Sequence, residues 1–203
     1  MRGVTAASRC FGLCLFLVAC GHGGLGDNAH LGPDRFEADP GWRVVPHMAP
    51  VRQTSDVDCG AAALASMLNH WGRPATLADV TAAHPPDARR GLYARDLRDF
   101  ARSQSLSAFL LAGTLADLDN EIGVGRPVLV GLVRSKGNTT YGHYAVVVGL
   151  RRDRTRVLIM DPSEGWRDEA VASFTAEWAR ARWVTLVVLP ASPAEASVPV
   201  SDL

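Results

Sequence analysis

The hydrophobic pattern of this chain changes from a helical to a strand-like period along its length, and that order limits the folds open to it. Helix candidates with apolar residues near one face occupy residues 59–71, 76–83, 92–103 and 115–122. Runs rich in Val and Leu, typical of buried strands, occupy residues 107–111, 127–133, 141–150, 156–160 and 183–189. Helices that mostly precede the strands predict an α+β domain, with N-terminal helices packed on a largely antiparallel sheet.

The first twenty residues have the features of an export signal. Arg2 and Arg9 precede an apolar run over residues 11–19, which is too short to span a bilayer as a helix. The run ends in Leu-Val-Ala-Cys20, which resembles the lipobox of bacterial lipoproteins. We therefore expect a signal peptide over residues 1–19, cleavage before Cys20 and lipidation of the Cys20 sulfur. The alternatives are an ordinary signal peptide, or a buried helix that ends by chance at a cysteine.

The rest of the chain divides into a tether, one domain and a tail. Residues 20–45 are rich in Gly, Asp, His and Pro without a hydrophobic period, and they predict a tether between the membrane and the domain. The domain is expected over residues 46–190, followed by a disordered tail over residues 191–203. The formal net charge of the chain is zero, so we expect no nucleic-acid partner.

Cys59 is the one cysteine left to the predicted domain, because Cys10 and Cys14 would leave with the signal and Cys20 would carry lipid. Cys59 would begin the first helix, where the positive end of the helix dipole favours a thiolate, the nucleophilic form of cysteine. Asp58, directly before it, is a suitable N-cap for that helix. A lone cysteine is also often a small buried apolar residue, and its position alone leaves both interpretations open.

Three further residues could complete a thiol-based site. His143 lies early in the strand candidate over residues 141–150, where a rigid strand would hold an imidazole base in one orientation. Asp161 follows the next strand candidate, and its carboxylate could fix the tautomer of that imidazole. Gln53, six residues before Cys59, could donate to a tetrahedral oxyanion together with the Cys59 backbone N–H. Taken singly, these residues have ordinary explanations: a satisfied strand-end histidine, an Asp-Pro turn and a surface glutamine.

Three islands of sequence carry a resemblance to a known family, and they lie within residues 51–189. They are Gln-Thr-Ser-Asp-Val-Asp-Cys-Gly-Ala-Ala-Ala-Leu over residues 53–64 with Trp71-Gly72 after it, His-Tyr-Ala-Val-Val from His143, and Asp161-Pro162. These islands resemble the bacteriocin-processing, double-glycine leader peptidases, which are papain-like cysteine peptidases. The resemblance implies a papain-like fold with Cys59 as nucleophile, His143 as base and acid, Asp161 as orienting carboxylate and Gln53 as oxyanion donor. Members of that family are often fused to peptide-exporting ABC transporters, whereas the apolar span of this chain is its signal.

We therefore expect a free-standing lipoprotein that acts as a cysteine peptidase of the bacterial cell envelope, facing the periplasm or the exterior. Its expected partners are a peptide or protein substrate, the membrane through the lipid anchor, and an envelope export or assembly system. No metal and no organic cofactor is expected, because the triad chemistry requires none and the histidine pairs lack the helical spacing of a zinc site. The alternatives are a cell-wall amidase or acyl transferase that uses the same thiol, and a non-catalytic peptide-binding module.

Overall fold

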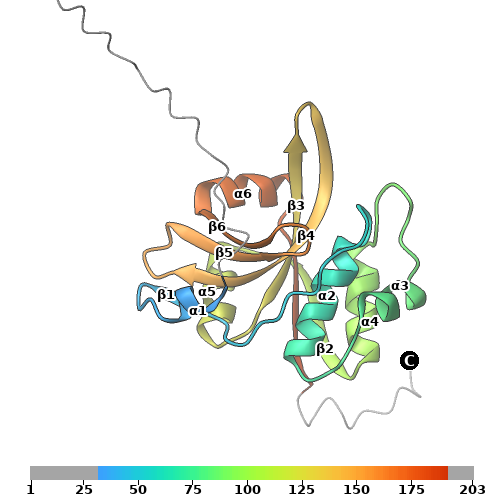
Figure 1. The fold of residues 1–203 in the computed structure, drawn as a ribbon, viewed down its shortest axis with the longest axis horizontal. Coiled ribbons are helices and arrows are strands. Elements are labelled where there is room, and N and C mark those ends of the chain that lie inside the picture. Colours follow the sequence, from blue (N-terminus) through green and yellow to red (C-terminus); the bar gives the residue numbers. More distant parts are fainter. Residues whose placement is uncertain (1–31, 192–203) are drawn as a thin grey trace, which may run out of the picture.

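The structure, a computed structural model, describes residues 32–191 (Figure 1). The expected signal peptide over residues 1–19, the expected lipidation site Cys20 and residues 192–203 of the expected tail lie outside the described residues. The helices are α1 (Asp34–Glu37), α2 (Cys59–His70), α3 (Leu77–Ala83), α4 (Ala94–Ser103), α5 (Leu115–Gly123) and α6 (Val171–Arg180). The strands are β1 (Trp42–Val44), β2 (Leu106–Ala112), β3 (Val128–Lys136), β4 (Thr139–Arg151), β5 (Arg156–Asp161), β6 (Gly165–Ala170) and β7 (Val184–Pro190). Within residues 32–191, no helix is long and apolar enough to cross a bilayer.

The strands form one seven-stranded sheet, in the order β2-β7-β3-β4-β5-β6 with β1 paired to β4. Every strand pair in the described part of the chain is antiparallel. Figure 1 shows α2, α3 and α4 grouped to one side of the sheet, while α6 lies beside β3 on the other side. The predicted α+β architecture, with N-terminal helices on an antiparallel sheet, is therefore confirmed.

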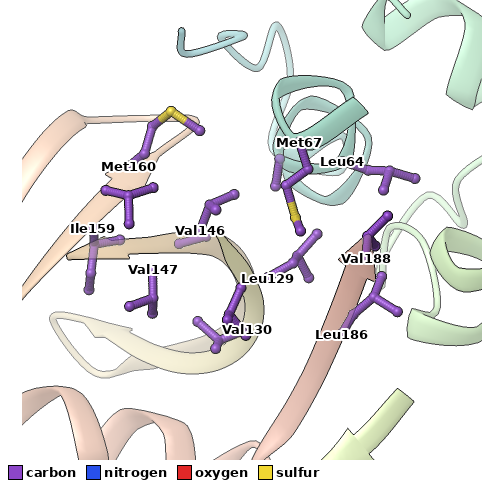
Figure 2. Close-up of a cluster of buried hydrophobic side chains, with 14 of the residues drawn as sticks. Leu64, Met67, Leu129, Val130, Val146, Val147, Ile159, Met160, Leu186 and Val188 are labelled. Carbon is purple, nitrogen blue, oxygen red and sulfur yellow. The ribbon is translucent and has the colours of Figure 1, made fainter. Parts of the chain in front are cut away.

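Helix α2 is buried on nearly all sides, which explains its almost entirely apolar sequence. Residues 59–68 are all buried, as expected for a helix without a polar face. Met67 points from α2 toward Leu129 of the sheet (Figure 2), and α3 and α4 cover the opposite side of the helix. Gly60 permits the close approach of α2 to β4, because a Cβ atom at this position would lie 2.9 Å from Cδ2 of Tyr144.

The sequence patterns above do not predict β6 and α6, which follow one another directly. In α6, Phe174 and Trp178 are fully buried, and their spacing of four residues places them on one face of the helix. Strand β6 is largely polar, and its charged residues are paired: Asp168 with Arg156 of β5 at 2.5 Å, and Arg167 with Glu169 of β6 itself at 3.2 Å. A strand whose charges are paired in this way lacks the apolar alternation that identifies strands from sequence.

The folded domain begins earlier than the expected boundary at residue 46. Residues 34–44, expected to belong to a tether over residues 20–45, contain α1 and β1. The Val45 N–H donates to the Val148 carbonyl at 2.7 Å, and Phe36 and Trp42 are buried with their ring centroids 5.1 Å apart. Two buried aromatic rings supply enough apolar area to hold this segment on the sheet, although Gly, Asp and Pro surround them. The tether prediction is therefore wrong for residues 34–45.

Candidate active site

Cys59 is the first residue of α2, as the sequence predicts. Only 6% of its surface is exposed, so Cys59 is largely shielded from solvent. Cys59 is a free thiol. The unpaired N–H groups of the first turn of α2 create a positive field that favours a thiolate at this position.

Asp58 is the N-cap residue of α2, as predicted, but the expected hydrogen bond from the first turn to its carboxylate is wrong. Within the described residues, the carboxylate makes no hydrogen bond to the first turn of α2. It accepts hydrogen bonds from the backbone N–H groups of Thr54 and Ser55 and, at 2.8 Å, from the Thr54 hydroxyl. The carboxylate thus closes the loop that precedes Cys59, and it fixes the direction from which the chain enters α2.

His143 and Asp161 come from neighbouring strands and meet on one face of the sheet. Val146 of β4 lies opposite Met160 of β5. His143 is three residues from Val146, and Asp161 is one residue from Met160, so both side chains point to the face opposite that pair. Nε2 of His143 lies 3.1 Å from Oδ1 of Asp161, and both side chains are buried.

The second ring nitrogen of His143 is available to Cys59, because Nε2 is already engaged with Asp161. The Cys59 side chain acts on His143 as one of the causes that raise the pKa of the imidazole. Burial lowers the pKa of His143, but the hydrogen bond to Asp161, the Cys59 side chain and the charge of Asp161 outweigh it and raise the pKa to about 9. The imidazole is therefore protonated at neutral pH and lies beside the thiol as a cation.

Asp161 is held by more partners than His143 alone. Its Oδ1 accepts hydrogen bonds from the backbone N–H of Ser163 at 2.8 Å, from the Ser163 hydroxyl at 2.7 Å and from the Glu164 N–H at 3.2 Å. Its Oδ2 accepts from Nη1 of Arg134 at 2.5 Å. Burial raises the pKa of Asp161, but the hydrogen bond and charge of His143, together with the charge of Arg134, hold this pKa well below its ordinary range. The carboxylate stays ionised although it is fully buried.

Gln53 lies on the loop that leads to Cys59, but its side-chain donor points elsewhere. Nε2 donates to the Ser55 carbonyl at 2.8 Å, and Oε1 is buried without a hydrogen-bond partner among the described residues. The backbone N–H of Gln53 donates to the Pro162 carbonyl at 3.1 Å. This bond ties the Gln53 loop to the turn after Asp161. The structure therefore brings Cys59, His143 and Asp161 together, whereas one N–H of the Gln53 amide is already donated to Ser55.

The sequence reasoning overlooks Arg134, which contacts Asp161 from β3. The strand expected over residues 127–133 ends one residue before it. The placement of Arg134 follows from the strand register, which the sequence alone does not give. Arg134 lies two positions beyond Leu132, the cross-strand partner of His143, so its side chain points to the same face of the sheet as His143.

Other features of the surface do not converge on these residues. A pocket of about 390 Å³ lies between α1, β1 and the end of α5, and its lining includes Trp42, Arg43 and Arg152 but none of the candidate site residues. Across residues 32–191, no group of three or more His, Cys, Asp or Glu side chains is arranged to hold a metal ion.

Comparisons with known proteins identify the fold and the family. A sequence model described as the peptidase C39 family matches residues 47–191. The peptidase domain of Streptococcus ComA, a bi-functional ABC transporter involved in a quorum sensing pathway, superposes with a TM-score of 0.61 and 22% identity, covering 71% of this chain and 100% of that domain. A C39-like peptidase from Bacillus anthracis gives a TM-score of 0.62 at 16% identity, covering 73% of this chain and 98% of that chain.

A third solved structure is a double glycine motif protease from an AMS/PCAT transporter in complex with its leader peptide. It gives a TM-score of 0.58 at 19% identity, covering 73% of this chain and 96% of that chain. Among curated proteins, none matches this chain. The family match extends over most of the described residues, and the structural similarities agree with it on the fold.

Proposed function

This chain belongs to the peptidase C39 family and is a cysteine-type peptidase, and we propose from that premise that Cys59, His143 and Asp161 are its catalytic triad. One observation carries the proposal. His143 uses Nε2 to bind the Asp161 carboxylate at 3.1 Å, while its other face meets Cys59 at the start of a helix. A nucleophile beside a base that a third group orients is the arrangement required for covalent acyl transfer.

The acylation step begins once the Cys59 proton has been transferred to His143. The thiolate sulfur then attacks the carbonyl carbon of a bound peptide to form a C–S bond. The carbonyl electron pair moves onto oxygen, where the Cys59 backbone N–H and a side-chain amide can donate to it. When the intermediate collapses, His143 gives its proton to the departing amine. The C–N bond breaks, and a thioester remains on Cys59.

Deacylation uses the same residues in reverse. The now neutral His143 takes a proton from water, the hydroxide attacks the thioester carbon, and the C–S bond breaks to release the acid product. The thiolate and the imidazolium are restored. The Asp161 carboxylate accepts the Nε2–H of His143 throughout the reaction. The other ring nitrogen of His143, on the Cys59 side, is therefore always the one that loses and gains the proton.

The proposed substrate is an exported peptide or protein at the cell envelope. Peptides with a double-glycine motif are the first class to test, since one structural neighbour is a double glycine motif protease solved with its leader peptide. The expected lipid anchor at Cys20 would place the enzyme on the outer side of the cytoplasmic membrane or on the outer membrane. In that location, partners belonging to an export or assembly system would deliver the substrate.

The test of this function joins a thiol probe to a cleavage assay. Wild-type protein and Cys59→Ser are incubated with double-glycine peptides and with cell-wall peptides, and products are identified by mass spectrometry. We expect cleavage of a backbone peptide bond, together with a transient thioester adduct on Cys59. Cleavage restricted to amide bonds of the cell-wall peptide would indicate the amidase instead. Binding without turnover, and without labelling of the thiol, would leave a peptide-binding module.

We further predict that the mature chain begins at Cys20 and carries acyl groups. Intact-mass analysis of membrane extracts should give the mass of residues 20–203 plus lipid, and Cys20→Ser should move the protein from the membrane to the soluble fraction. The prediction rests on the lipobox, because a modified cysteine must be the first residue of the mature chain. A membrane-extracted chain that retains Met1, or one cut at another bond, would contradict it.

A further inference from the structure

We infer that Arg134 is a positioning residue of the active site: it clamps the Asp161 carboxylate in place and limits how firmly that carboxylate holds the protonated His143. The inference rests on the proposed triad and extends it by one residue. Arg134 is far from solvent, contacts the carboxylate directly and belongs to none of the sequence islands that suggested the site.

The fold places Arg134 and His143 on different oxygens of the Asp161 carboxylate. Arg134 is 4% exposed and Asp161 is 0% exposed, so water does not screen the pair. The two carboxylate oxygens divide their partners between them. Oδ1 takes His143, Ser163 and the Glu164 N–H, whereas Oδ2 takes Arg134 at 2.5 Å. A carboxylate held on both oxygens cannot rotate without breaking at least one charged contact.

Arg134 is itself held from a second side. Its Nε lies 3.3 Å from Oε2 of Glu177 on α6. A buried guanidinium is tolerated only when charged partners compensate for the loss of hydration, and here two carboxylates from different elements bind Nη1 and Nε. The planar guanidinium then spans Asp161 and Glu177 in one fixed orientation.

The remaining charges near this cluster come from β6 and from the turn before it. Nη1 of Arg167 lies 3.9 Å from Oδ2 of Asp161, but Arg167 is bound more closely by Glu164 at 2.9 Å and by Glu169 at 3.2 Å. Burial raises the pKa of Glu169. Arg167 is therefore largely neutralised by its own neighbours, and Arg134 is the cation that acts most directly on Asp161.

The position of this charge predicts its effect on His143. Asp161 favours the imidazolium, and the positive charge of Arg134 beside that carboxylate opposes the same protonation and lowers the pKa of His143. Asp161 without Arg134 would hold the imidazolium more firmly, and His143 would give up its proton less readily to the departing amine. Arg134 thus holds the Asp161 carboxylate in place and also weakens the stabilisation that this carboxylate gives to the protonated His143.

The experiment is a titration of the His143 ring by NMR, combined with the pH profile of iodoacetamide labelling at Cys59. Arg134→Met should move the ionisation of His143 to higher pH by about half a unit or more, because a nearby like charge has been removed. The change in the Cys59 labelling rate that accompanies deprotonation of His143 should move to higher pH by the same amount. Arg134→Lys keeps a positive charge near the same place and should shift the titration less. Arg180→Met is the matched control, since Arg180 is an exposed arginine that contacts Ser135 and not Asp161.

The outcomes separate this inference from the proposed triad. If wild-type labelling depends on His143 but Arg134→Met leaves both the titration and the labelling profile on the wild-type curves, Arg134 is only a structural residue and the inference is wrong. If His143→Ala is labelled at the same rate as wild type, the proposed triad itself is wrong. Removing Arg134 leaves Glu177 unpaired, and the single variant could therefore lose its fold. The Arg134→Met/Glu177→Gln double variant removes that charge as well and should show the same upward shift.

Discussion

Replacing His143 with alanine should slow iodoacetamide labelling of Cys59 at pH 6 by about 10- to 100-fold and lower kcat by roughly 10⁴-fold or more. At pH 6 an ordinary cysteine is ionised in only about 0.3% of molecules, because its pKa is about 8.5. A thiol paired with the His143 imidazolium reacts as thiolate instead, although a stabilised thiolate is also a weaker nucleophile. The alanine variant loses both the pairing and the proton donor for the departing amine.

The labelling experiment has clear controls. Cys59→Ser gives the blank, and His84→Ala makes the same substitution at a histidine whose ring packs near Phe100, away from the site. Asp161→Asn should slow labelling less than His143→Ala does, because it disturbs the orientation of the base while the base remains. If the labelling profiles of wild type and His143→Ala superimpose, with midpoints near the pKa of an ordinary thiol, Cys59 and His143 are not a catalytic pair. The non-catalytic binding module would then be favoured.

The pKa of His143 also gives the pH range of activity. This pKa is raised to about 9, so the imidazolium is present at neutral pH and is lost as the pH rises through about 9. The proton required by the departing amine is lost over the same range. Turnover should therefore hold from neutral pH into mildly alkaline solution and fall above about pH 9, and in Asp161→Asn the fall should begin at lower pH.

Elements whose boundaries depend on local chemistry could be predicted from the sequence. The end of α2 is one such case. Gly72 adopts φ of 67°, a left-handed conformation that glycine takes readily, and Trp71 before it is the C-cap. The strand candidates in the centre of the sheet carry long runs of Val and Leu because both of their faces are covered. These runs can therefore be recognised in the sequence without any knowledge of the neighbouring strands.

Features that depend on partners distant in sequence could not be predicted in the same way. The carboxylate of Asp58 turns back to Thr54 instead of capping α2, a choice between two local donors that composition does not decide. Arg134 is buried only because Asp161 and Glu177, 27 and 43 residues further along the chain, meet it in space. An arginine in a strand gives no sign of such partners until the register of β3, β4 and β5 is known.

The candidate triad lies between these two cases. The residue types and their order indicate thiol chemistry, and a cysteine at a helix start can be located from the sequence. The contact between His143 and Asp161 depends on the pairing of Val146 with Met160, which sets both side chains on one face. A shift of one residue in that register would place the carboxylate on the opposite face of the sheet. Sequence order suggests the pair, and sheet register determines whether the two side chains meet.

Replacing Gln53 with alanine should lower kcat by roughly 100- to 1,000-fold while leaving the fold intact. The loss of one oxyanion donor typically costs about 2.7–4 kcal/mol in the chemical step. The Gln53 amide donates one N–H to the Ser55 carbonyl, and the prediction requires its second N–H to reach the oxyanion once a peptide is bound. Because that neutral hydrogen bond contributes only about 1 kcal/mol, the variant should unfold at nearly the wild-type denaturant midpoint.

The Gln53 measurement is single-turnover acylation of Cys59, with thiol labelling as an independent reading of the nucleophile. Gln104→Ala is the matched control, because it removes a glutamine whose amide donates to the Ser103 hydroxyl at the end of α4. An oxyanion donor acts on the intermediate and not on the thiolate. Gln53→Ala should therefore slow acylation while iodoacetamide labelling stays at the wild-type rate. Equal losses in both would mean that the Gln53 side chain acts by holding the loop before Cys59, through its hydrogen bond to the Ser55 carbonyl, and unchanged acylation would remove it from the site.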